Sequence, residues 1–254
     1  MALEVAALLL SIVTASIAGL VGCFVVMRRM SLAADAFSHV ALPGIGVALA
    51  LGIHPLFGAT AMLVFGALII WGLERRTRIA TETVIGVVFS SALAVGGMMS
   101  SGEDLVDALL GGPGQLGPGE LAFGAAAAIA IGTFIIMQRS RLILWLVSAD
   151  IARTAGIDVA RLNLSFLMMF ALTIALGLRY LGVLLMGSLI IIPAVTAKRL
   201  ARNLTEMLGY AVAVAVAATV AGTYLAHRAH RPTGPIIITI GAVLFVASLF
   251  KRTR

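Results

Sequence analysis

Long apolar runs separated by short charged segments make up most of the chain. A membrane-spanning helix needs about 20 apolar residues, because each residue adds ~1.5 Å along the axis and the hydrocarbon core is ~30 Å thick. Nine runs reach or approach this length, at residues 5–27, 31–51, 57–73, 83–99, 121–137, 162–178, 182–197, 207–225 and 236–250. The pattern predicts an all-α polytopic membrane helix bundle of about nine transmembrane helices, with residues 1–254 forming a single transmembrane domain.

Composition agrees with this pattern, and charge predicts an orientation. Hydrophobic residues make up 61% of the chain and charged residues 11%, with a mean hydropathy of +1.11. The net charge of +7 would suggest nucleic acid in a soluble protein, but in a membrane protein basic residues first report orientation, so we exclude nucleic acid as a partner. When successive loops are assigned alternately to the two sides of the membrane, 15 of the 18 Lys and Arg residues lie on one side. The other side holds Arg179, Arg228 and Arg231. The positive-inside rule then predicts an external N-terminus and a cytoplasmic C-terminus.

The run from Ser31 to Leu51 is unusual because it carries Asp35 and His39 at membrane depth. A charge there costs about 2.5–3.5 kcal/mol, so ionisable residues in spans usually face protein or an aqueous path. Asp35 and His39 are four positions apart, so both lie on one helix face and could ligate one metal ion. A structural hydrogen bond from His39 to Asp35 or to a neighbouring carbonyl is the other interpretation, and the pair alone leaves both open.

Proline interrupts two of the predicted spans, at Pro43, which Gly44 follows, and at Pro193. Proline removes a backbone donor and kinks a helix, and paired interruptions in the two halves of a transporter often mark its substrate path. These three residues are therefore candidates for helix interruptions near a path.

Residues 100–120 carry four acidic and no basic side chains, which predicts either an acidic outer mouth that concentrates cations or a plain solvated loop.

The connection at residues 138–161 contains the signals of a short helix. Ser148 can cap its N-terminus, Asp150 would lie in its first turn, and Gly156 can end it. Such a helix on the cytoplasmic face could be gripped by a peripheral partner. An interfacial helix without a partner is the alternative.

The sequence lacks three motifs that would indicate chemistry of its own. GxxxxGK[ST], GxSxG and HExxH do not occur, so the chain has no phosphate-binding loop, nucleophile elbow or zinc-protease site of these kinds. Energy for transport would come from an ion gradient or from another subunit. Cys23 is the only cysteine, which leaves no thiolate cluster for a metal.

Five segments occur together in a recognisable order. They are DAFSHVALPGIGVAL (35–49), TETVIGVVFSSALAVG (81–96), SADIARTAGIDVARL (148–162), GVLLMGSLIIIPAVTAKRLAR (182–202) and PTGPIIITIGAVLF (232–245). In sequence and order they resemble the permease subunits of ATP-binding-cassette transporters for zinc, manganese and iron. One departure is Leu109-Leu110-Gly111-Gly112, where family members commonly have a polar residue in the last position.

The resemblance implies a multi-pass permease of the bacterial cytoplasmic membrane that works as a homodimer. Its partners would be membrane lipid, a cytoplasmic ATPase and an extracytoplasmic metal-binding protein. ATP would be hydrolysed on the partner subunit, so the chain would be no enzyme and would hold no permanent cofactor, with a divalent metal ion as its transported substrate. Asp35 and His39 match the family's metal-binding positions. The segment that matches the family's coupling helix, on which the ATPase docks, includes Ser148, Asp150, Ile151, Ala155 and Gly156.

The predicted function is import of zinc, manganese or iron by alternating access, with Asp35 and His39 holding the ion briefly. Carboxylate and imidazole ligands suit these metals. The main alternative is a gradient-driven secondary transporter with Asp35 as an ion or proton site. A membrane structural or assembly protein with a structural Asp/His bond is a third class.

Overall fold

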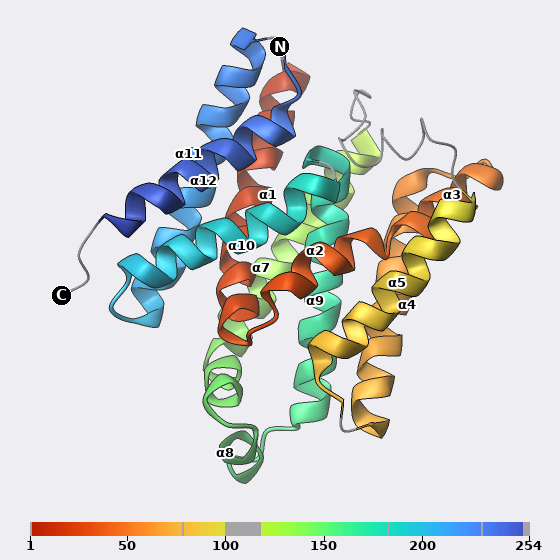
Figure 1. The fold of residues 1–254 in the computed structure, drawn as a ribbon, viewed down its shortest axis with the longest axis vertical. Helices are drawn as coiled ribbons and strands as arrows, with labels where there is room; N and C mark the ends of the chain where they lie inside the picture. Colours follow the sequence, from red (N-terminus) through yellow and green to blue (C-terminus); the bar gives the residue numbers. More distant parts are fainter. Residues whose placement is uncertain (1, 78, 100–117, 182, 230, 251–254) are drawn as a thin grey trace.

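The computed structural model describes all residues except 1, 78, 100–117, 182, 230 and 251–254. Regular secondary structure in the described residues is entirely helical, which confirms the predicted helix bundle (Figure 1). The predicted acidic loop, apart from its last residues, and the departure at Leu109–Gly112 lie outside the described residues. The helices are α1 (Ala2–Met27), α2 (Ser31–His39), α3 (Leu42–Ala50), α4 (Pro55–Arg76), α5 (Thr81–Met99), α7 (Pro118–Val147), α8 (Ala149–Thr154), α9 (Val159–Leu181), α10 (Val183–Leu200), α11 (Leu204–Ala229) and α12 (Thr233–Leu249).

Seven segments of the described chain are long and apolar enough to cross a membrane. Six lie within single helices, and the seventh, Ser31–Ala50, combines α2 and α3. The helix α12 is a shorter apolar helix, and α10 has 18 residues with a largely apolar sequence. Every predicted span therefore coincides with a helix or a helix pair, while the total of nine membrane crossings stays a prediction.

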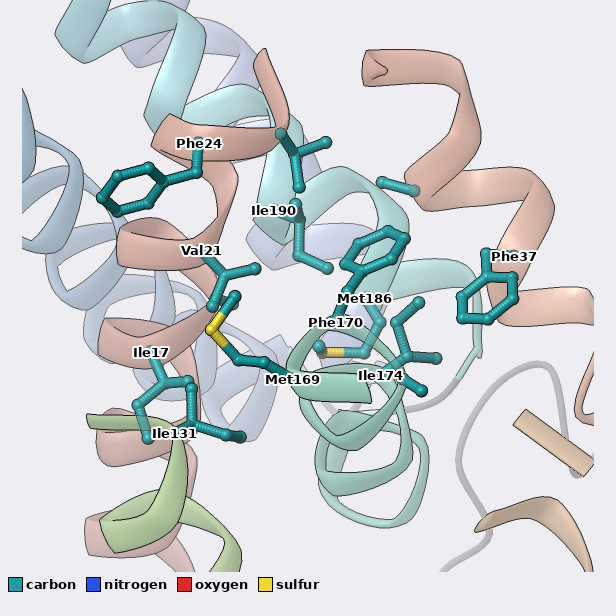
Figure 2. Packing of buried hydrophobic residues seen from close by; sticks show 14 of the residues in the cluster. Ile17, Val21, Phe24, Phe37, Ile131, Met169, Phe170, Ile174, Met186 and Ile190 are labelled. Atoms are coloured by element: carbon teal, nitrogen blue, oxygen red, sulfur yellow. The ribbon is translucent and has the colours of Figure 1, made fainter. Parts of the chain in front are cut away.

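The core lies between α1, α9 and α10. Figure 2 shows Val21 and Phe24 of α1 with Met169 and Phe170 of α9 and Ile190 of α10, and each of these side chains is at most 4% exposed. Such burial of large apolar side chains between helices fixes how the helices pack. The helix α2 joins this core through Phe37, whose ring stacks on Phe170 with centroids 5.4 Å apart.

The predicted interruption after His39 is present. The helix α2 ends at His39, and α3 begins at Leu42 with Pro43 in its first turn, where a missing N–H leaves no helical bond unmade. Gly44 has a second role, because a Cβ atom there would lie 2.2 Å from the carbonyl oxygen of Gly58. Close approach of α3 and α4 therefore requires glycine at this position.

Pro193 does not divide its helix in two, and its place near a path stays a prediction. The helix α10 is continuous from Val183 to Leu200, with Pro193 inside it. Proline removes one helical hydrogen bond, but in membrane helices neighbouring helices and local adjustments compensate for it. Pro193 is buried, and α10 packs against α1, α9, α11 and α12, so this packing holds the helix together around the proline.

The connection between α7 and α9 is shorter than predicted. The sequence placed its start at Gln138, but α7 continues through Arg139 and Arg141 to Val147. Apolar residues return after Arg141, and Leu142 is fully buried while Trp145 is 8% exposed. Burial against α1 and α9 therefore extends the helix beyond the charged residues that suggested an end. Only α8 and its flanking turns remain between α7 and α9.

Candidate functional site

The helix α2 places Asp35 and His39 on one face, in the segment that is long enough to cross the membrane. Asp35 is exposed in the protomer and His39 is half-buried. From the first residue of α2, Asp35 lies roughly 6 Å and His39 roughly 12 Å along the axis. An exposed carboxylate at this depth requires a polar path or a protein partner, since lipid would not solvate it.

His39 has a ring nitrogen without a partner. Its Nδ1 atom is buried and has no hydrogen bond in the described part of the chain. The ring lies against Phe89 of α5, with centroids 5.7 Å apart. A structural hydrogen bond from Nδ1 to Asp35 is therefore not formed. A buried nitrogen left without a hydrogen bond is costly unless something else binds it, and neutral imidazole nitrogen is a common metal ligand.

Gly187 of α10 lies directly against Asp35. A Cβ atom at this glycine would be 2.8 Å from Oδ1 of Asp35 and 2.9 Å from its Cα atom. Any larger residue would therefore push the carboxylate or the helix away. The sequence motif around residue 187 suggested only family membership, and nothing in it pointed to this contact with Asp35. The backing by α10 fixes one side of Asp35 while the carboxylate stays exposed on the other.

Asp35 and His39 offer a carboxylate and an imidazole on one face of α2. Among the described residues, no group of three or more His, Cys, Asp or Glu side chains is placed to hold a metal ion. A carboxylate oxygen and an imidazole nitrogen suit zinc, manganese or iron(II), in keeping with the ligand types that these ions prefer. Two such ligands alone would bind an ion weakly.

The predicted short helix is α8, and its local signals are confirmed. The hydroxyl of Ser148 accepts hydrogen bonds from the backbone N–H groups of Asp150 and Ile151, so Ser148 is the N-cap. Asp150 lies in the first turn, and its carboxylate pairs with Arg153 at 2.7 Å. Gly156 follows the helix with φ of +78°, a conformation that favours glycine.

One face of α8 is free in the protomer. Ala152 is fully buried, whereas Ile151 is 49% exposed and Ala155 is also exposed. Figure 1 shows α8 at the lower end of the view, beyond the end of α7. An apolar side chain exposed outside the predicted span is a feature of interaction surfaces.

Comparison with known proteins gives consistent matches over nearly the whole chain. The sequence profile described as the ABC 3 transport family matches residues 2–252. The chain is 32% identical over 254 residues to the high-affinity zinc uptake system membrane protein ZnuB of Haemophilus influenzae, covering 98% of this chain and 97% of that protein. It is 29% identical to the manganese import system permease protein ScaB of Streptococcus gordonii, covering 96% of this chain and 89% of that one. Its fold is similar to a chain of PsaBC from Streptococcus pneumoniae in complex with Fab, with a TM-score of 0.85, 27% identity, and 99% and 92% of the two chains covered.

Proposed function

Because the chain belongs to the ABC 3 transport family, we propose that it is the membrane permease subunit of an importer for a divalent transition-metal ion. The relatives named above are a zinc and a manganese protein, and a relative 32% identical is a probable iron transport system membrane protein of Haemophilus influenzae. The transported ion is therefore zinc, manganese or iron, as expected from the sequence.

One observation carries the proposal, namely the pair of Asp35 and His39 at membrane depth. The carboxylate is exposed and the buried Nδ1 of His39 lacks a hydrogen-bond partner in the described chain, so two donor groups are available to an ion. The ion enters from the outer face, is held briefly by the two residues, and leaves inward when the bundle changes conformation. Pro43 and Gly44 follow the pair at the junction of α2 and α3, where the outer part of the segment can bend.

The proposed transporter is a homodimer. Each chain offers two donors, and an exposed Asp35 at membrane depth is favourable where it faces a second protein surface or a shared aqueous path. Two chains related by a two-fold axis would bring together two copies of the pair. Four donors at a shared axis would complete a coordination shell that one chain leaves unfinished.

Energy comes from a cytoplasmic ATPase that docks on α8. The chain has no phosphate-binding loop, and Ile151 and Ala155 leave one face of α8 exposed. An extracytoplasmic metal-binding protein delivers the ion to the opposite face. A gradient-driven transporter is not favoured, because the matched family is one of ABC transporters.

The proposed orientation predicts which positions are accessible from outside the cell. In a Cys23→Ala background, Ile53→Cys in the connection of α3 and α4 should react with a membrane-impermeant maleimide added to whole cells. Arg76→Cys at the end of α4 and Thr154→Cys in α8 should react only after the cells are opened, although all three positions are exposed in the protomer. Labelling of Arg76→Cys or Thr154→Cys in intact cells would contradict an external N-terminus and a cytoplasmic C-terminus.

Reconstitution tests the function itself. The permease, purified with its ATPase into proteoliposomes and given its binding protein, should accumulate zinc, manganese or iron(II) only when hydrolysable ATP is present. A non-hydrolysable ATP analogue should stop uptake, while collapsing the proton and sodium gradients should leave it unchanged. Uptake that follows a gradient and ignores ATP would support the secondary transporter instead.

A further inference from the structure

A polar cluster lies at the end of the bundle that carries α8. We call it the Arg28 cluster, and it consists of Arg28, Glu74, Thr81, Trp145 and Asn163. Arg28 donates from Nη1 to Oδ1 of Asn163 at 2.9 Å. Asn163 in turn donates from Nδ2 to Oε2 of Glu74 at 2.6 Å, and the other carboxylate oxygen of Glu74 accepts from Thr81. This chain of hydrogen bonds joins the residue that follows α1 to α9, α4 and α5.

Aromatic rings pack against Arg28 within the cluster, and Trp71 lies beside it. The guanidinium of Arg28 lies over the ring of Trp145, with Cζ 3.8 Å from the ring centroid, and 5.6 Å from the ring of Phe166. Trp71 of α4 donates from Nε1 to the backbone oxygen of Ala160 at 2.9 Å. Arg guanidinium stacked on tryptophan is attracted by the ring face, and more strongly where water is excluded. Arg28 is therefore held by a hydrogen bond to α9 and by stacking on α7.

Burial affects the pKa of the Arg28 guanidinium. Desolvation lowers the pKa of Arg28 to about 10, opposed by the charge of Glu74, so the guanidinium stays charged at neutral pH. Its charge and that of Glu74 are bridged by the amide of Asn163. A pocket of about 550 Å³ opens beside these residues and is also lined by Arg153 and Asp158. The pocket leaves space next to the cluster on the side of α8.

The partners of Arg28 flank α8 in the sequence and in space. Trp145 lies on the last turn of α7, three residues before the N-cap Ser148, and Asn163 lies in the second turn of α9. Asp158 caps α9 through hydrogen bonds from the N–H groups of Ala160 and Arg161. The helix α8 packs against α7 and α9, so a shift of α8 would act on the two helices that carry these residues.

Arg28 also lies close to the start of α2 in the sequence. It follows the last residue of α1, and the chain then reverses through Arg29, which has φ of +61°, and the buried Met30. A left-handed conformation is uncommon for arginine and persists where the surroundings fix it. The helix α2 begins at the next residue, and Asp35 lies in its second turn. A displacement of Arg28 thus reaches the Asp35 helix through only two residues.

We propose that Arg28 is a positioning residue that transmits movement of α8 to α2, and so links ATP hydrolysis on the partner to the position of Asp35. The inference rests on the proposed function, because it requires an ATPase docked on α8. Three observations support it. The helix α8 packs against α7 and α9, which carry Trp145 and Asn163. These two residues hold Arg28, and Arg28 precedes the turn into α2. With the Arg28 cluster intact, a movement of α8 changes the position of α2.

The test measures the ratio of metal transported to ATP hydrolysed in proteoliposomes that contain the complete transporter. Zinc and manganese ions are supplied in separate experiments. Arg28→Gln keeps a polar side chain but removes the charge and the stacked guanidinium. We expect ATP hydrolysis to continue while metal transported per ATP falls by on the order of tenfold, a usual size for coupling between sites. Arg28→Lys keeps the positive charge but lacks the planar guanidinium, so its ratio of metal transported to ATP hydrolysed should lie between those of Arg28→Gln and the wild type. Arg76→Gln is the matched control, since Arg76 is exposed at the end of α4, and its ratio should equal that of the wild type.

A purely structural role for Arg28 would lower the amount of folded complex and both rates together, leaving the ratio unchanged, and that result would overturn the inference. If Arg28→Gln does not accumulate, Asn163→Leu decides, because it breaks both amide hydrogen bonds and leaves Arg28 on Trp145. A lowered ratio in Asn163→Leu supports the inference, and a wild-type ratio overturns it. Absence of ATP-dependent metal transport in the wild type would instead refute the proposed function, with which the inference would fall.

Discussion

Asp35→Asn is expected to abolish metal uptake without lowering the amount of permease in the membrane. The substitution keeps the size and hydrogen-bonding capacity of the side chain but removes the anionic oxygen that we propose binds the ion. Loss of a residue that only supports a ligand typically costs ~10–100-fold in metal affinity or activity, so loss of the ligand itself should cost at least ~100-fold. Asn has nearly the same shape as Asp, so the contact of residue 35 with Gly187 is kept. Uptake of radioactive or isotopically enriched zinc and manganese, with immunoblots of the same membranes, measures both quantities.

His39→Leu should have the same effect on uptake for a related reason. It removes the imidazole nitrogen donor and replaces a buried Nδ1 that lacks a hydrogen-bond partner with an apolar group. Removing an unsatisfied polar atom is near neutral or stabilising, so folded permease should be at least as abundant as the wild type. A structural Asp35–His39 bond predicts the reverse, with Asp35→Asn nearly silent and His39→Leu poorly accumulated.

Ser31→Ala provides the control for both variants. Ser31 is the first residue of the same helix, and its replacement is also a polar-to-apolar change. Uptake should stay near the wild-type rate. If Asp35→Asn transports metal normally at normal abundance, Asp35 is not a ligand and the proposed site is wrong.

The sequence predicted the features that depend on a few neighbouring residues. The cap at Ser148, the acidic first turn at Asp150 and the end of α8 at Gly156 follow from side chains and backbone angles within one short segment. The placement of Asp35 and His39 on one face likewise needs only the helical period. Local chemistry of this kind is independent of how the helices pack.

The sequence could not predict contacts between distant segments. Arg28 and Asn163 are 135 positions apart. From the sequence alone, Arg28 is only one of many basic residues that indicate the orientation. Gly187 lies against Asp35 because α10 packs on α2, which periodicity does not reveal. Packing also explains why two helices continue through local signals for an end, since burial of Leu142 carries α7 past its charged residues and burial of Pro193 keeps α10 continuous. In each case tertiary contacts overrode a local signal for a helix end.

The second large effect is expected from the free face of α8. Ala155→Arg should separate the permease from its ATPase and stop uptake, because a long charged side chain would clash with a surface docked against Ile151 and Ala155. Disruption at the centre of an interface typically costs ~2 kcal/mol or more, which lowers affinity by at least ~30-fold. The fold should tolerate the change, since Ala155 is exposed and a cation near a helix C-terminus is favourable. Co-purification of the ATPase and metal uptake are the measurements.

Ala80→Arg is the matched control for Ala155→Arg. Ala80 is exposed in the connection of α4 and α5, on the side of the membrane where the orientation proposed above also places α8. The same substitution there should leave ATPase association and uptake unchanged. Gly156→Arg is a poorer test, because φ of +78° disfavours any residue with a Cβ atom and the end of α8 would be strained as well. Normal ATPase association and normal uptake in Ala155→Arg would mean that α8 does not dock the partner through this face, and the free face would then be an interfacial surface only.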